Sequence, residues 1–155
     1  MNLILWRHAD AEYQHNDKMR KLTDKGCRQA QISADWLLAH LPIDKYRVYT
    51  SEAVRSQQTA SYLHQSISIE PLLNPDTVPQ NLTTLLLQQI DYGNCIWVGH
   101  QPWLGQLCSY LLNGIWLPQQ YWSVKKSSFW WFEVSFFHHQ PSARLKVVLN
   151  PGVLK

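Results

Sequence analysis

The chain has 155 residues, 45% of them hydrophobic and 16% charged, and we expect one domain, residues 1–155, that buries roughly two-thirds of its unfolded surface. The net charge of +3 is spread along the chain, which argues against a nucleic-acid-binding face, and no apolar run approaches the ~20 residues of a membrane span. Cys27, Cys95 and Cys108 are odd in number and indicate free thiols of a reducing, cytoplasmic compartment, with neither a disulfide framework nor a metal site.

Strand-like and helix-like segments alternate along the chain. Strands are expected at 3–6, 47–49, 66–70, 95–98, 128–135 and 143–149. Helices are expected from Thr23 to about Leu41, from about Ala53 to His64 with Ser51 as N-cap, from near Pro79 to Ile90, and from Pro102 to Gly114. This alternation predicts an α/β fold of three layers, an α/β/α sandwich with a mostly parallel central sheet.

Polar residues follow three of these strands. Arg7 and His8 come directly after the first strand, Arg55 lies in the first helical turn after the second, and His100 follows the strand at 95–98. Taken singly, each could also be an ordinary polar residue that closes a strand. In an open α/β sheet, however, ligands bind outside the carboxyl ends of the strands. Arginine forks beside a neutral imidazole suit phosphoryl chemistry, so the four residues together predict a phosphate pocket.

Four segments resemble the histidine phosphatase superfamily in their order and content: Trp6–Ala9, Leu22–Gly26, Thr50–Ala60 and Val98–Leu104. The resemblance extends over nearly the whole chain and is strongest to SixA-type phosphohistidine phosphatases. It implies a fold like that of phosphoglycerate mutase and a reaction that needs no metal or cofactor. It also implies that His8 is the nucleophile and becomes phosphohistidine, while Arg7, Arg55 and His100 bind the oxygens of the transferring phosphoryl group.

The chain departs from the superfamily pattern at the general acid. Many relatives carry a glutamate in the loop that follows the strand at 66–70, and here that loop begins with Pro71, Leu72 and Leu73. An ester leaving group needs a proton, whereas the protonated imidazole of a phosphohistidine leaves without a strong acid. The missing glutamate therefore favours a phosphohistidine substrate. Asp76 and Glu12 are candidate proton donors, although a loop cap and a solvated carboxylate are equally good interpretations of them.

Two further residues are candidates for substrate binding. Arg20 precedes the Leu22–Gly26 segment, as an arginine does in SixA-type proteins, and Ser127 lies before a late strand that borders the pocket in the family. A solvated loop position is an equally good interpretation of Arg20.

The resemblance implies a partner that bears phosphohistidine, either a phosphotransfer domain in signal transduction or a phosphocarrier of sugar uptake. We expect phosphate as a product, no nucleic acid or membrane as partner, and a monomer or weak dimer. The alternative enzyme is a small-molecule phosphomonoesterase of the same superfamily that acts on a sugar, nucleotide or diphosphate. A silent phosphate-binding module is a further alternative, which the presence of all four pocket residues disfavours.

Overall fold

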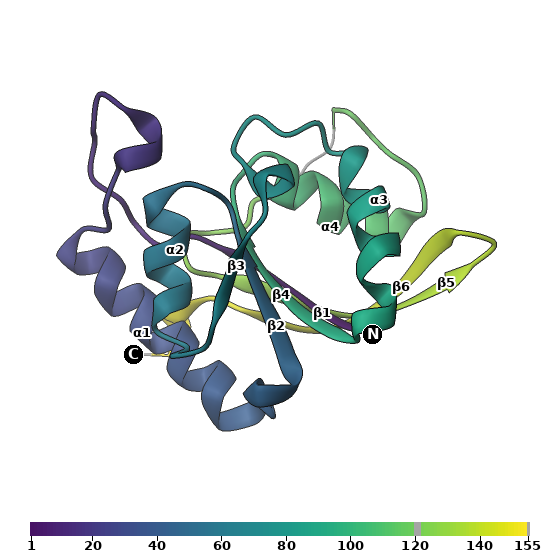
Figure 1. The fold of residues 1–155 in the computed structure, drawn as a ribbon, viewed down its shortest axis with the longest axis horizontal. Helices are drawn as coiled ribbons and strands as arrows, with labels where there is room; N and C mark the ends of the chain where they lie inside the picture. The colour runs from purple at the N-terminus through teal and green to yellow at the C-terminus, as the bar shows by residue number, and fades with distance from the viewer. Residues whose placement is uncertain (120–121, 155) are drawn as a thin grey trace.

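The computed structural model, which describes residues 1–119 and 122–154, is built around one six-stranded sheet in the order β3-β2-β4-β1-β5-β6 (Figure 1). The strands are β1 (Asn2–Arg7), β2 (Tyr46–Thr50), β3 (Ile67–Ile69), β4 (Asn94–Gly99), β5 (Phe129–Phe137) and β6 (Gln140–Leu149). The first four are parallel to one another, and β5 and β6 are antiparallel to their neighbours. The prediction of a mostly parallel sheet is confirmed.

Helices cover both faces of the sheet: α1 (Asp24–His40) and α2 (Val54–Ser61) on one, α3 (Asn81–Gln89) and α4 (Trp103–Asn113) on the other (Figure 1). Alternate side chains of a strand point to opposite faces. In β1, Ile4 and Trp6 pack with α1 and α2, whereas Leu3 and Leu5 pack with α3 and α4. All four side chains are fully buried, so the predicted three-layer sandwich has a hydrophobic core on each side of the sheet.

The carboxyl ends of β1, β2 and β4 lie at one edge of the sheet, and the segment before β5 reaches the same edge because β5 is antiparallel to β1. Backbone hydrogen bonds join these ends. The His8 N–H donates to the Gly99 carbonyl at 3.1 Å, and the Ser127 N–H donates to the His8 carbonyl at 3.2 Å. The backbone around His8 is therefore held from both sides by neighbouring chain segments.

Some local predictions differ from the structure. The expected N-cap Ser51 does not cap α2, whose N-cap is Ala53 without a side-chain hydrogen bond. The polar loop predicted between the last two strands is only a two-residue turn, because His138 and His139 both adopt positive φ angles, of 50° and 62°, as a tight hairpin with type I′ geometry requires. No described helix is long and apolar enough to cross a bilayer.

Candidate active site

His8 follows β1 directly and is 93% removed from solvent, with 7% of its surface exposed. Its Nδ1 lies 2.8 Å from the Ala9 carbonyl oxygen, which can only accept, so Nδ1 carries the proton and Nε2 presents a lone pair. Burial first, and then the positive charges of Arg55, Arg7 and Arg20, lower the pKa of His8 to about 3, against the hydrogen bond to Ala9, which raises it. Burial is a larger cause than the arginines, and His8 is a neutral imidazole at physiological pH.

Arg55 lies in the first turn of α2 and is almost fully buried beside His8. Its Nε donates to Nε2 of His8 at 3.3 Å. The two terminal nitrogens face a loop residue, Asp17: Nη1 donates to the Asp17 carbonyl at 2.8 Å and Nη2 to the carboxylate at 3.1 Å. The guanidinium is thus aimed at the free nitrogen of His8, where a transferring phosphoryl group would lie.

His100 follows β4 and contacts Arg55 from the other side. Its Nδ1 lies 3.4 Å from Nη2 of Arg55, and since a guanidinium nitrogen only donates, Nδ1 accepts and Nε2 carries the proton. Nε2 is 2.7 Å from the Ser51 hydroxyl and 3.2 Å from the Ser56 hydroxyl. Burial first, and then the charges around it, lower the pKa of His100 to about 2. A neutral His100 therefore supports Arg55, with its ring centroid 5.1 Å from that of His8.

Arg7 and Arg20 complete a group of three arginines around His8. Arg7 gives one N–H to the Val124 carbonyl at 2.9 Å, and Arg20 gives its Nε to the Glu12 carbonyl at 2.9 Å. The charges of both arginines lower the pKa of His8 and of His100. The structure thus brings together Arg7, His8, Arg20, Arg55 and His100, all five of which the sequence nominated.

Asp17 is a site residue that the sequence analysis did not find. Its carboxylate lies between Arg55, at 3.1 Å, and Arg20, at 3.4 Å. Partial burial raises its pKa, but hydrogen bonds from the two arginines and their charges outweigh this and hold the pKa below the usual value. Asp17 is therefore an ionised carboxylate and not a proton donor. It begins a single turn of 3-10 helix, Asp17–Met19, in a stretch without hydrophobic periodicity, where no sequence pattern distinguishes it from other polar residues.

Thr59 joins the backbone of the first motif to α2. The Ala9 N–H donates to the Thr59 hydroxyl at 3.0 Å, and the hydroxyl donates to the Arg55 carbonyl at 2.8 Å. All three residues are buried. Thr59 lies four residues after Arg55 and hence on the same helix face, which is the signal that could have identified it from the sequence.

No described hydrogen bond joins the side chain of any remaining candidate to the side chain of His8. Ser127 is fully buried and its hydroxyl donates to the Gln29 carbonyl at 3.0 Å, so this hydroxyl joins the segment before β5 to α1. Asp76 and Glu12 are exposed, and no hydrogen bond joins either carboxylate to a described site residue. Across residues 1–119 and 122–154, no group of three or more His, Cys, Asp or Glu side chains is arranged to hold a metal ion.

The sequence model of the histidine phosphatase superfamily (branch 1) matches residues 3–77, which include Arg7, His8 and Arg55. The first half of the chain carries the sequence pattern of the histidine phosphatase superfamily. It is 36% identical over 75 residues to a phosphohistidine phosphatase SixA homolog of Haemophilus influenzae, a match that covers 45% of this chain and 46% of that protein. It is 32% identical over 82 residues to phosphoglycerate mutase 2 of Saccharomyces cerevisiae, covering 47% of this chain and 26% of that one.

The likeness to solved structures extends beyond residues 3–77. The solved structure of the protein histidine phosphatase SixA complexed with tungstate superposes with a TM-score of 0.83 at 23% identity and covers 100% of both chains. At this identity the likeness concerns the fold. The six-stranded sheet and its four helices thus have the same fold as that structure.

Proposed function

We propose that the protein is a phosphohistidine phosphatase that removes the phosphoryl group from a histidine of a protein, with His8 as nucleophile. The observation that carries the proposal is the buried, neutral His8, whose unprotonated Nε2 faces the guanidinium of Arg55. The lone pair of a neutral imidazole can attack phosphorus, and arginine forks bind phosphoryl oxygens in the transition state. The similarity to the Haemophilus influenzae SixA homolog supports this reaction.

The reaction has two steps. Nε2 of His8 attacks phosphorus, the bond from phosphorus to the substrate imidazole breaks, and that imidazole leaves in neutral form because its other nitrogen is protonated. Nδ1 of His8 keeps its proton and donates it in a hydrogen bond to the Ala9 carbonyl, which stabilises the phosphorylated ring. Water then hydrolyses the phosphohistidine of His8 and releases inorganic phosphate. Arg7 and Arg55 bind the phosphoryl oxygens throughout, while His100 holds Arg55.

The leaving group decides between the two classes of substrate. A phosphate ester expels an alkoxide, for which a positioned acid contributes about 10²–10⁴-fold in rate. Asp17, whose carboxylate contacts the site, is ionised and bound to Arg55 and Arg20, and no described hydrogen bond joins the carboxylate of Asp76 or of Glu12 to the site. A site of this kind favours a phosphoramidate, whose nitrogen leaving group needs no such acid.

We infer a cytoplasmic setting from the free thiols of Cys27, Cys95 and Cys108.

The test compares two substrates with EDTA present. Wild type and His8→Ala are incubated with a phosphohistidine-bearing carrier protein and with p-nitrophenyl phosphate, and released phosphate is followed. We expect fast dephosphorylation of the carrier, slow ester hydrolysis and no activity in the variant. Ester hydrolysis as fast as that of the carrier would contradict the proposal and point to a small-molecule phosphomonoesterase. Inactivity on both substrates would reduce the site to a phosphate-binding pocket.

A further inference from the structure

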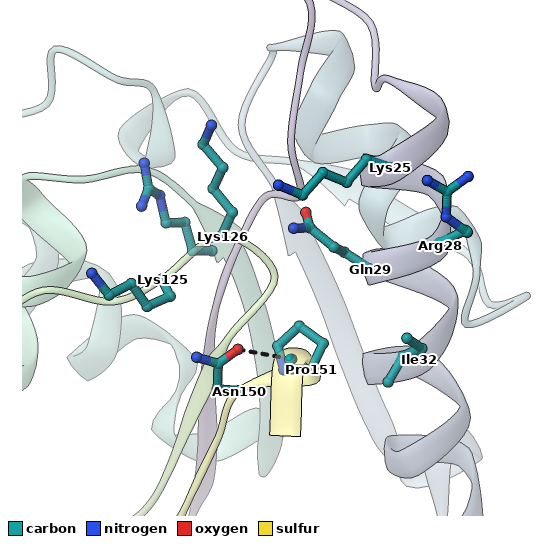
Figure 2. Close-up of a pocket in the computed structure, with 10 residues that line it drawn as sticks. Lys25, Arg28, Gln29, Ile32, Lys125, Lys126, Asn150 and Pro151 are labelled. Atoms are coloured by element: carbon teal, nitrogen blue, oxygen red, sulfur yellow. Dashed lines mark hydrogen bonds between the residues drawn. The ribbon is translucent and has the colours of Figure 1, made fainter. Parts of the chain in front are cut away.

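A basic cleft of about 790 Å³ adjoins the active site (Figure 2). It lies between α1, the segment before β5 and the short helical turn η5 (Pro151–Val153). Its lining residues are Arg7, Lys25, Arg28, Gln29, Ile32, Lys125, Lys126, Asn150, Pro151 and Gly152. Half of these residues are Lys or Arg and none is Asp or Glu. Arg7 belongs both to the cleft and to the group around His8, so the two sites are adjacent and have this residue in common.

Most of the positive charge in the basic cleft is not compensated by the protein. Lys126 forms a salt bridge with Asp10 at 2.6 Å. Lys25, Arg28 and Lys125 form no salt bridge with any described residue, and all three are exposed. In Figure 2, Lys25 extends from α1 toward the side of the cleft that carries Lys126. Like charges gathered around one cavity repel one another, so an anion in the cleft would relieve this repulsion.

We propose that the basic cleft docks an acidic segment of the protein substrate, whose carboxylates bind Lys25, Arg28 and Lys125 while the phosphohistidine reaches His8. This inference rests on the proposed function. Small-molecule sites are mostly enclosed and apolar, with a few fixed polar groups. Here the cations are exposed, flexible and drawn from separate segments, as in surfaces that steer a charged protein into register. Docking beside Arg7 adds recognition that a free phosphoryl compound does not receive.

Binding is tested first, because it does not depend on catalysis. The probe is a capped tetraglutamate peptide, titrated at low salt into wild type, into Arg28→Glu/Lys125→Glu and into the control Lys45→Glu. Lys45 is an exposed lysine that precedes β2, at the opposite edge of the sheet from His8. We expect the double variant to bind about tenfold more weakly and the control to bind as wild type does. Orthovanadate, an oxyanion for the His8 site, should leave peptide binding unchanged.

Kinetics then connect the cleft to the substrate. The double variant should lower kcat/KM for the phosphorylated carrier about tenfold and leave the hydrolysis of N-phosphoimidazole, which has no acidic segment, unchanged. The proposal would be overturned if wild type did not bind the peptide, or if Lys45→Glu weakened peptide binding as much as the double variant. It would also be overturned if orthovanadate displaced the peptide, or if the double variant lost as much activity on N-phosphoimidazole as on the carrier. Cleft-dependent binding of pyrophosphate but not of the peptide would overturn it in favour of a small polyanion. If wild type hydrolyses neither substrate, the proposed function fails, and peptide binding still decides the role of the cleft.

Discussion

Thr59→Val tests how the chain aligns its nucleophile. Valine has the shape of threonine without the hydroxyl, so the substitution removes the acceptor of the Ala9 N–H and leaves that buried N–H without a partner. A buried donor without a hydrogen-bond partner lowers the free energy of unfolding by about 1–3 kcal/mol. The Arg55 carbonyl also loses the bond from the hydroxyl but remains within α2. The Ala9 carbonyl fixes the tautomer of His8, so movement of Ala9 should also reduce catalysis, by about tenfold for each 1.4 kcal/mol of lost alignment.

Urea denaturation and turnover of N-phosphoimidazole measure the two effects separately. With a denaturant slope of about 1–3 kcal/mol per molar urea, the midpoint of Thr59→Val should fall by roughly 1 M. Thr59→Ser is the matched control, because it keeps the hydroxyl and loses only a methyl group. We expect the serine variant to retain kcat while the valine variant loses it. A valine variant with the stability and the kcat of wild type would refute the claim that Thr59 aligns the nucleophile through Ala9.

Three further predictions follow from the same geometry. Histidine NMR titration should show that His8 and His100 are still neutral well below pH 6.5. Between about pH 3 and 6.5 the unfolded chain therefore binds more protons than the folded chain, so the free energy of unfolding should fall as the pH drops through this window. Protonation of His8 or His100 near pH 6.5 would contradict this. Asp17→Asn should strengthen inhibition by inorganic phosphate about fivefold, since the anion no longer competes with an ionised carboxylate for Arg55, and weaker inhibition would refute that competition. Gly26→Ala should destabilise the fold by about 1–3 kcal/mol, because its Cβ would collide with a backbone carbonyl of the loop after β1, and an unchanged urea midpoint would exclude this contact.

The sequence predicted those parts of the site that follow from the ends of strands. Arg7 ends a buried apolar strand, His8 and His100 come directly after such strands, and parallel strands bring their carboxyl ends to one edge. Asp17 could not be predicted in this way, because a loop position acquires its partners only when the chain folds. Ser127 illustrates the same limit: its hydroxyl donates to the Gln29 carbonyl of α1, a partner far away in the sequence that no local pattern indicates.

The basic cleft is also a product of folding. Lys25 and Arg28 lie about a hundred residues from Lys125 in the sequence, and η5 closes the cleft from the end of the described chain. The sequence does not show that these lysines and arginines gather around one cavity, because α1 and the segment before β5 come together only in the folded chain, where the Ser127 hydroxyl donates to the Gln29 carbonyl. The clustering of positive charges from distant segments is therefore evident only in the structure.

Trapping the phosphoenzyme tests the central claim most directly. The protein is mixed with a carrier labelled with ³²P on its histidine, quenched in alkali within one turnover, and digested so that the labelled peptide can be sequenced. We expect the label on His8 as an acid-labile, alkali-stable phosphohistidine, absent in His8→Ala and retained in His15→Ala, a variant of an exposed surface histidine. Label on another residue, or release of phosphate by His8→Ala at the wild-type rate, would contradict the assignment of His8 as the nucleophile.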